Sequence, residues 1–458
     1  MDHPTLVRPL KHRVSSFQET SEFAQFDRRF QEAARLDYNP YFVCHEMPLR
    51  DVSMVNGRRV LNFGSYNYLG MSGHPEVSAA AKAAIDRYGT SASGSRILSG
   101  EKKIYQELES EIAEWKHADD ALVLAAGNLT NTTCIGNFCT EDDAIYYDML
   151  SHSSIEQGCR LSAAHTKRFP HNDFLTLERM LYRNRDKHEK VVIVVEGVYS
   201  MDGDIAPIPE FVRLKRAYGC FLLVDEAHSS GVIGATGGGV DEYFGLAPDD
   251  IDMKVGTLSK ATGSIGGYIA GNRSLITYFR YSLPGFVFAA GISPPSAAAA
   301  LAALRILRRD PSIVARLQDN VAFFIREAHR RGFNTCLAKE APIIPILIGM
   351  DEYAYIISKM LLRKGVFVPT ASYPAVPKNK ARLRFNVISE HTHEQIAKAL
   401  DCLEETLQEV GARWQLGAAP QESAFQARAP ATRAQEWEDE AEDEDKAGDE
   451  LERTLDLP

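Results

Sequence analysis

Three polar residues follow short apolar runs in the middle of the chain, and their types suit chemistry on a carbonyl group. Asp225 directly follows the run Phe221–Val224 and precedes His228, while Lys260 comes shortly after the run Met253–Val255. A lysine amine in its neutral form can make a Schiff base with an aldehyde. A carboxylate at the carboxyl end of a buried parallel strand lies where such sheets bind ligands. Asp225 could equally cap a helix, and Lys260 could be an ordinary loop lysine, so neither residue alone decides the function.

Small and hydroxyl residues lie beside Lys260 and at a second predicted strand end. Thr257 and Ser259 could offer their hydroxyl groups to an anion such as phosphate. The three residues that follow the run Ala121–Ala126, where a helix should begin, are Gly127, Asn128 and Leu129. Free backbone N–H groups at a helix start bind phosphate. A lone glycine turn is a weak signal, so these segments predict a phosphate site only in combination with the residues above.

His152 and Ser200 also follow predicted strands. The imidazole of His152, after the run Ile145–Tyr147, could stack on a planar ring or could belong to an ordinary loop histidine. Ser200 lies between the run Val191–Glu196 and the dipeptide Asp202-Gly203, which is typical of turns. Together the segments supply a carboxylate, an amine, a stacking imidazole and a phosphate-binding turn. This set matches the requirements of pyridoxal 5′-phosphate (PLP).

Neither a metal site nor a nucleic-acid surface is predicted. The seven cysteines include no Cys-x-x-Cys pair, and no paired histidines follow at ligand spacing, so we expect free thiols in a reducing cytoplasm. We find neither a secretory signal nor an apolar run long enough to span a bilayer. Most of the net charge of −11 comes from residues 436–458, which contain twelve acidic and two basic residues, and no basic stripe is present.

The elements that must position these residues alternate between strands and helices. Continuous apolar runs suit strands that are buried on both faces, and their alternation with helices predicts an α/β fold with a doubly wound, mostly parallel sheet. The predicted strands are Ala121–Ala126, Ala144–Tyr147, Val191–Glu196, Phe221–Asp225, Met253–Thr257 and Tyr268–Gly271. Helices are expected over Ile104–His117, Leu175–Asn184 and Ile208–Tyr218.

We expect four segments along the chain. Residues 1–60 form an N-terminal extension with an amphipathic helix over Phe23–Leu36, and residues 61–310 form the large cofactor-binding domain. Residues 311–414 are predicted to form a small C-terminal α+β domain. Residues 415–458 are acidic and too poor in apolar side chains to offset the entropy of ordering, which predicts a disordered tail.

With these residues placed, the chain resembles the α-oxoamine synthases, a family of fold-type I PLP enzymes, from roughly Arg59 to Leu407. The order of the Asp-Glu-Ala-His and Thr-x-Ser-Lys segments is highly specific. The motifs that carry the resemblance are Leu61-Asn62-Phe63, Asn67-Tyr68-Leu69-Gly70, Gly94-Ser95-Arg96, Val224-Asp225-Glu226-Ala227-His228, Gly256-Thr257-Leu258-Ser259-Lys260, Gly266-Gly267-Tyr268 and Arg382-Leu383-Arg384. The resemblance implies a homodimer with a shared active site.

The resemblance also implies a role for each residue near the cofactor. Lys260 would bind the cofactor covalently and later move the α-proton of the amino acid. Asp225 would pair with the pyridinium nitrogen, and His152 would stack on the ring face. His228 would contact the phenolic oxygen of the ring, with Ser200 nearby. The residues that would surround the phosphate or bind the cofactor beside it are Gly127, Asn128, Leu129, Thr257 and Ser259.

The implied reaction condenses a small amino acid (glycine, alanine or serine) with an acyl thioester of coenzyme A or of an acyl carrier protein. Carbon dioxide leaves and an α-amino ketone forms. Arg384 would bind the amino-acid carboxylate, and Asn67 would lie at the substrate mouth. The alternatives are a ligase of the 2-amino-3-ketobutyrate type that does not decarboxylate, or another fold-type I PLP enzyme such as an aminotransferase. A non-catalytic partner subunit is a further alternative, but such a subunit would be expected to lack Lys260.

Three segments depart from the family pattern. Tyr105 stands where relatives often have a histidine, which could alter the acyl-thioester side of the site. Ser153 and Ser154 follow His152, where Ala-Ser is usual. Ala289 and Ala290 stand where many relatives have Ser or Thr near the phosphate of the partner subunit, so one phosphate contact across the dimer would be missing.

Overall fold

The computed structural model describes residues 14, 16–35 and 39–414. The predicted acidic tail, residues 415–458, lies outside the described residues. The described residues up to 404 form one compact unit, and the described residues from 405 on belong to a second. Every residue of the predicted site lies in the first unit.

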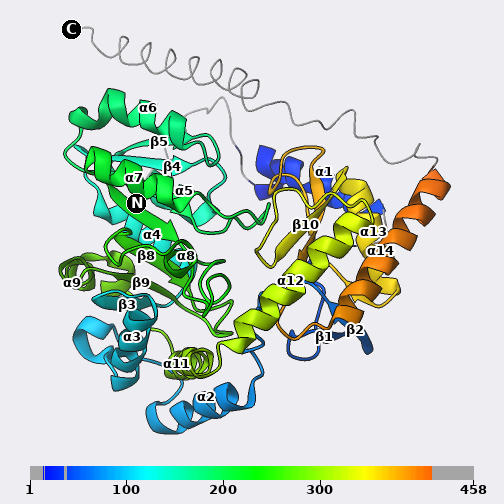
Figure 1. The fold of residues 1–458 in the computed structure, drawn as a ribbon, viewed down its shortest axis with the longest axis horizontal. Helices are drawn as coiled ribbons and strands as arrows, with labels where there is room; N and C mark the ends of the chain where they lie inside the picture. The colour runs from blue at the N-terminus through cyan, green and yellow to red at the C-terminus, as the bar shows by residue number, and fades with distance from the viewer. Residues whose placement is uncertain (1–13, 15, 36–38, 415–458) are drawn as a thin grey trace, which may run out of the picture. The chain divides into compact units, whose positions relative to one another are not determined.

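A seven-stranded sheet is the largest sheet of residues 1–404 (Figure 1). Its strand order is β3-β9-β8-β7-β6-β4-β5. In that order the strands span Asp120–Leu124, Gly267–Gly271, Met253–Thr257, Phe221–Asp225, Val191–Glu196, Ala144–Asp148 and His165–Phe169. Neighbouring strands are parallel from β8 to β5, whereas β9 is antiparallel to both of its neighbours. This mostly parallel sheet confirms the predicted fold class.

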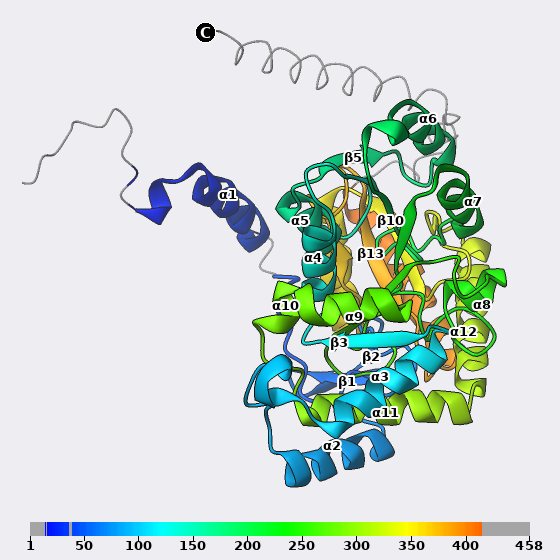
Figure 2. The ribbon, with the colours of Figure 1, turned by 90° about the vertical axis from the view of Figure 1, so that its left-hand side faces the viewer.

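Both faces of the sheet are covered by helices, because the strands alternate their side chains between two apolar clusters. In β3, Ala121 and Val123 belong to the cluster that includes residues of helices α3 (Lys103–Trp115) and α11 (Pro294–Arg309). Leu122 and Leu124 belong to the cluster that includes residues of α4 (Gly127–Phe138), α5 (Ser153–Leu161) and α9 (Arg273–Ser282). Figure 2 shows α3 and α11 on one side of β3 and α9 on the other. These two layers make the sheet doubly wound.

Three of the helices around this sheet, those over Lys103–Trp115, Phe174–Asn184 and Ile208–Tyr218, agree with the predicted helices to within two residues. The bounds of the helices around the sheet are α2 Pro75–Tyr88, α3 Lys103–Trp115, α4 Gly127–Phe138, α5 Ser153–Leu161, α6 Phe174–Asn184, α7 Ile208–Tyr218, α8 Val240–Phe244, α9 Arg273–Ser282, α10 Pro284–Val287 and α11 Pro294–Arg309. The sequence did not predict β5. It is an edge strand in which His165 to Arg168 are exposed and only Phe169 is buried, so it has no apolar run.

Two smaller sheets are built largely from later segments of the chain. Strands β10 (Ile343–Gly349), β13 (Ala381–Asn386) and β12 (Thr370–Ala371) form an antiparallel sheet in that order. Strands β1 (Val52–Val55) and β2 (Arg58–Asn62) pair with each other, and β2 also pairs with β11 (Val366–Phe367). The predicted domain boundaries at residues 60/61 and 310/311 remain predictions.

Four further α-helices lie outside the large sheet, and three short helices, Phe17–Glu19, Arg96–Gly100 and Arg185–Lys187, join other elements. The bounds of the four α-helices are α1 Ser21–Arg35, α12 Ser312–Arg330, α13 Asp351–Arg363 and α14 His393–Trp414. Helix α1 matches the amphipathic helix expected over Phe23–Leu36. From Ser21 to Trp414, no helix combines the length and the apolar character that crossing a bilayer requires.

Candidate active site

The predicted site residues gather at one edge of the large sheet, because parallel strands present their carboxyl ends on the same side. Asp225 is the last residue of β7, and Glu196, the last residue of β6, is its partner in register. Thr257 is the last residue of β8. His152 and Lys260 lie in the loops that follow β4 and β8. The structure thus places chemistry-bearing residues from four consecutive strands of the sheet side by side.

Asp225 is buried, and each of its carboxylate oxygens accepts one hydrogen bond. The backbone N–H of Ala227 lies 2.9 Å from Oδ1, and Nδ2 of Asn131 lies 2.6 Å from Oδ2. No helix begins here, since the next one starts at Val240, so Asp225 is not a helix cap. Each oxygen keeps a lone pair for another donor, and a protonated ring nitrogen is such a donor.

The Lys260 side chain makes no hydrogen bond or ion pair with any residue that the structure describes. Burial lowers the pKa of its amine to about 8, although the negative charges of Asp225 and Glu196 act to raise it. The positive charge of Arg384 lowers this pKa further. A lysine with this pKa supplies neutral amine near neutral pH, which is the form that condenses with an aldehyde.

His228 is buried near charged groups and forms a hydrogen bond with a tyrosine. Its Nδ1 lies 2.9 Å from the hydroxyl of Tyr68. Burial, followed by the charges of Lys260 and Arg384, lowers the pKa of His228 well below its ordinary value. Since Nδ1 bonds to Tyr68, Nε2 is the nitrogen left for a ligand. Burial also raises the pKa of the Tyr68 hydroxyl well above its ordinary value, which keeps this hydroxyl protonated.

His152 begins helix α5 as its N-cap and has an exposed side chain. Its backbone N–H donates to Oε1 of Glu196. Glu196 is fully buried beside Asp225, and burial, with the negative charge of Asp225 in second place, raises the pKa of Glu196 well above its ordinary value. Burial beside Asp225 thus favours the neutral form of the Glu196 carboxyl group.

A cradle for an anion forms where α4 begins. The backbone N–H groups of Gly127, Asn128 and Leu129 make no hydrogen bond within the described structure, and Ala126 gives no side-chain cap. A Cβ atom added at Gly127 would lie 2.8 Å from Oγ1 of Thr257, so only glycine leaves this space open. The Thr257 hydroxyl in turn lies 2.8 Å from that of Ser259. Free N–H groups and paired hydroxyls fit a phosphate group.

Arg384 reaches the site from β13 of a smaller sheet. Its Nε donates to the carbonyl oxygen of Ser200 at 2.8 Å, and its Nη1 donates to Oδ1 of Asn386 at 3.1 Å. The guanidinium carbon lies 5.3 Å from the centre of the Tyr66 ring. These contacts fix the plane of the guanidinium group, which also has a side-chain hydrogen bond with Tyr68. The planar fork of a guanidinium suits an anion such as a carboxylate.

The side chain of Asn67 bonds to the backbone of its own loop and to that of Leu49. Its Nδ2 donates to the carbonyl oxygens of Leu49 and Ser72, at 3.1 and 3.2 Å, and its Oδ1 accepts the N–H of Ser72. The substrate role of Asn67 therefore remains a prediction. Tyr105, where the family pattern often has histidine, is fully buried and donates to the carbonyl oxygen of Ile292 at 2.6 Å.

Sequence reasoning did not assign Tyr68, Asn131 or Glu196 to the site. Each contacts a predicted site residue that is distant in sequence: Tyr68 and His228, for example, are 160 positions apart. Glu196 offered one usable signal, because it ends a predicted strand next to the one that ends at Asp225.

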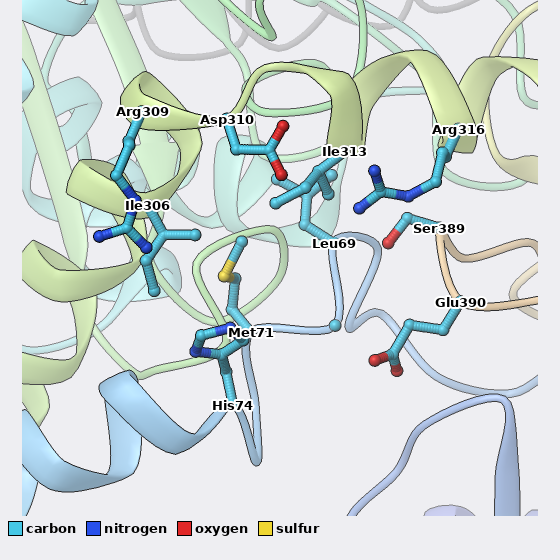
Figure 3. A pocket seen from close by; sticks show the side chains of 11 residues that line it. Leu69, Met71, His74, Ile306, Arg309, Asp310, Ile313, Arg316, Ser389 and Glu390 are labelled. Carbon is cyan, nitrogen blue, oxygen red and sulfur yellow. The ribbon is translucent and has the colours of Figure 1, made fainter.

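A cavity of about 350 Å³ lies elsewhere and contains none of these residues (Figure 3). Its lining includes Leu69, Met71, Ile306 and Arg316. Its residues Arg309 and Glu390 already form ion pairs, with Glu76 and Arg50 respectively. No described group of three or more His, Cys, Asp or Glu residues could hold a metal ion.

Comparison with known proteins finds related sequences and folds. Residues 58–403 match the family described as aminotransferase class I and II. The 8-amino-7-oxononanoate synthase of Fervidobacterium nodosum is 42% identical over 354 residues, which are 77% of this chain and 89% of the relative. The corresponding enzyme of Thermoanaerobacter pseudethanolicus is 39% identical over 359 residues, covering 78% and 90%.

Two solved structures share the fold. The Sphingomonas wittichii serine palmitoyltransferase superposes with a TM-score of 0.83 and 32% identity, covering 87% of this chain and 100% of that one. The S. paucimobilis serine palmitoyltransferase, bound to a PLP–myriocin aldimine, gives a TM-score of 0.83 and 30% identity, also covering 87% and 100%.

Proposed function

This chain belongs to the aminotransferase class I and II family, and we propose that it is a PLP-dependent α-oxoamine synthase. It condenses a small amino acid with an acyl thioester, with loss of carbon dioxide, to give an α-amino ketone. The observation that carries this proposal is the Lys260 amine, which has a pKa of about 8 and no hydrogen bond within the described structure, facing Asp225 at the sheet edge. The relatives named 8-amino-7-oxononanoate synthase and the structural neighbours named serine palmitoyltransferase support it.

The residues present fit the cofactor. Asp225 would hold the ring nitrogen, His152 would cover the ring face, and His228, with Ser200 nearby, would contact the phenolic oxygen. The phosphate-binding set would be Gly127, Asn128, Leu129, Thr257 and Ser259. PLP, when bound, supplies an electron sink for the negative charge that develops on the α-carbon of the amino acid.

The chain's own residues bind and orient the amino acid. The guanidinium group of Arg384 would hold the substrate carboxylate, and the bond from Nε to the carbonyl of Ser200 would keep the guanidinium plane fixed. Lys260 would remove the α-proton, because its depressed pKa leaves a neutral amine to act as the base. The loop that bears Asn67 would lie at the entrance to the substrate site.

We further propose that the enzyme is a homodimer with a shared active site. The loop that bears Ala290 bridges to Ser95, and together with a neighbouring loop these segments expose a set of large apolar side chains. The set consists of Ile97, Leu98, Ile265 and Phe288. Phe288 is 86% exposed and Leu98 is 85% exposed, which is unusual for side chains of this size and supports an interface here.

The same proposal locates the enzyme in a reducing cytoplasm. All seven of its cysteines are free, including four that are buried. Free thiols persist in reducing compartments, and this supports the assignment. Fractionation of the producing cells, with an antibody against the full chain, tests it.

Product analysis tests the proposed reaction. The holoenzyme is incubated with glycine, alanine or serine and a series of acyl thioesters of coenzyme A and of an acyl carrier protein. Mass analysis should find an α-amino ketone for one preferred pair. A 2-amino-3-keto acid that retains the carboxylate would instead indicate a non-decarboxylating ligase, and a keto acid formed from the amino acid would indicate an aminotransferase.

A further inference from the structure

Asn131 donates both of its amide hydrogens inside the site. Its Nδ2 lies 2.6 Å from Oδ2 of Asp225 and 3.0 Å from Oγ of Ser154. Asn131 is buried in the second turn of α4, and its Oδ1 has no partner among the described residues. Exchanging the two ends of the amide would place its oxygen against the Asp225 carboxylate, so the carboxylate fixes the orientation.

Through Ser154, the orientation of the Asn131 amide determines how the ring of His152 is hydrogen-bonded. Because the Ser154 oxygen accepts from Asn131, its own hydrogen is free to donate to Nδ1 of His152, 2.8 Å away. The backbone N–H of Ser154 also donates to that nitrogen, at 3.2 Å, and thereby caps helix α5. Two donors converge on Nδ1, so Nδ1 carries no hydrogen and the neutral ring carries its hydrogen on Nε2.

The charges around His152 also favour the neutral ring. His152 lies at the N-terminus of α5, where the helix dipole opposes a positive charge. Partial burial lowers its pKa and so does the charge of Lys260, while the charge of Asp225 opposes them. Two further titratable groups lie close to His152: His228, whose pKa is lowered in part by the charge of His152, and Glu196, which accepts from the His152 backbone. Burial favours the neutral form of both.

Close packing of α4 on α5 makes the contact from Asn131 to Ser154 possible. A Cβ atom added at Gly158 of α5 would lie 2.8 Å from the Cβ of Ile135 and 3.2 Å from the backbone oxygen of Asn131. A Cβ atom added at Gly136 of α4 would lie 3.1 Å from the side chain of Leu161. The two glycines therefore allow the helices to approach closely enough for the amide to reach the hydroxyl.

We propose that Asn131 is a positioning residue that couples Asp225 to His152 through Ser154 and holds His152 as the neutral tautomer protonated on Nε2. A neutral ring adds no positive charge beside Lys260, and its single N–H remains available as a donor. The proposal rests on the proposed function only for the identity of the group that His152 covers. The tautomer itself does not depend on the substrate.

Nitrogen-15 NMR of the holoenzyme, labelled on histidine, tests the proposal. The His152→Asn variant identifies the His152 signals by their loss. In the unaltered protein we expect an unprotonated Nδ1 and a protonated Nε2. Ser154→Ala removes one donor to Nδ1, so the pKa of His152 and the acid limb of kcat/KM should both rise by about one pH unit. Asn131→Leu should produce the same shift and also alter the visible circular dichroism of the bound cofactor.

Two matched variants separate positioning from general structural damage. Ser153→Ala changes the neighbouring serine, and Asn137→Leu repeats the asparagine substitution on α4 at a residue that donates only to the backbone of Thr133. Both should leave the pKa of His152 unchanged.

The proposal is overturned if the His152 hydrogen is on Nδ1. It is also overturned if Ser154→Ala shifts neither the pKa of His152 nor the pH profile relative to Ser153→Ala. A fall in melting temperature without a pKa shift would show a purely structural role. If the tautomer is as expected but no amino ketone forms with any substrate pair, the proposed function fails and the coupling stands.

Discussion

At the scale of single residues, Lys260 combines a partly buried side chain with an amine that bonds to no described residue. The charges that act on its pKa are those of Asp225, Arg384 and Glu196, and they come from three different segments of the chain. Burial removes hydration that would stabilise the ammonium form, so the amine is neutral at a pH where most lysines are charged. The reactivity of Lys260 therefore depends on its surroundings.

The rate at which PLP attaches to the cofactor-free protein should depend on pH through the pKa of Lys260. Below a pH of about 8 the attachment rate should fall roughly tenfold per pH unit, because only the neutral amine attacks an aldehyde, and above it the rate should level off. Stopped-flow absorbance measures the rate, and Lys260→Ala is the control that should give no covalent signal. A rate that keeps rising to pH 10 would mean that Lys260 titrates as an ordinary lysine.

Asp225→Asn should lower kcat by about a hundredfold or more, because a neutral amide cannot keep the ring nitrogen protonated. The fold should persist, since the side chain keeps its size and can still accept from Ala227. Steady-state kinetics together with thermal melting of the same preparation separate the two effects. Near-normal turnover would mean that Asp225 only stabilises its own turn and has no role in catalysis.

The strand-end residues could be predicted from the sequence, but their partners could not. Asp225, His152 and Lys260 each follow an apolar run, and the rule that parallel sheets bind ligands at the carboxyl ends of strands applies to them directly. Tyr68 and Asn131 lie on a loop and inside a helix, where nothing local predicts a site. Only the tertiary fold brings them to His228 and Asp225.

At the scale of elements, helix α4 supplies both the phosphate cradle at its start and Asn131 one turn later. Its position depends on close contacts with its neighbours, because Gly127 abuts Thr257 and Gly158 of α5 abuts Ile135. The sequence predicted the strand before α4 and the turn that begins it. It could not predict edge strand β5, whose polar side chains lack periodicity.

Gly127→Ala should weaken PLP binding by about ten- to a hundredfold, because the added Cβ would lie 2.8 Å from the Thr257 hydroxyl and displace it from the cradle. Equilibrium dialysis of the cofactor measures the effect. Gly411→Ala on α14 is the matched control, since a Cβ there meets no atom within 4 Å. Equal affinities for the two variants would argue against a phosphate site at the start of α4.

At the scale of the whole molecule, the site is completed by a residue from outside the large sheet. Arg384 on β13 bonds to the carbonyl of Ser200, in the loop after β6. The sequence predicted a second group of smaller strands and helices, but it could not show that this group delivers Arg384 to the sheet edge. The exposed apolar set around Leu98 and Phe288 likewise becomes apparent only in the folded chain.

Leu98→Asp should dissociate the dimer, because a carboxylate in an apolar interface loses its hydration without gaining a partner. Light scattering coupled to gel filtration measures the mass. Tyr182→Asp on α6 is the control, since Tyr182 is 82% exposed but lies outside the apolar set. If both Leu98→Asp and the control remain dimeric, the interface lies elsewhere on the molecule.

The fate of the amino-acid carboxylate tests the central claim most directly. The holoenzyme is given the preferred amino acid labelled with carbon-13 at the carboxylate, first alone and then with the acyl thioester. The account predicts no labelled carbon dioxide before the thioester is added. After addition it predicts one labelled carbon dioxide for each unlabelled amino ketone, and none from Lys260→Ala. Labelled carbon retained in the product, or released before the acyl partner is added, would contradict it.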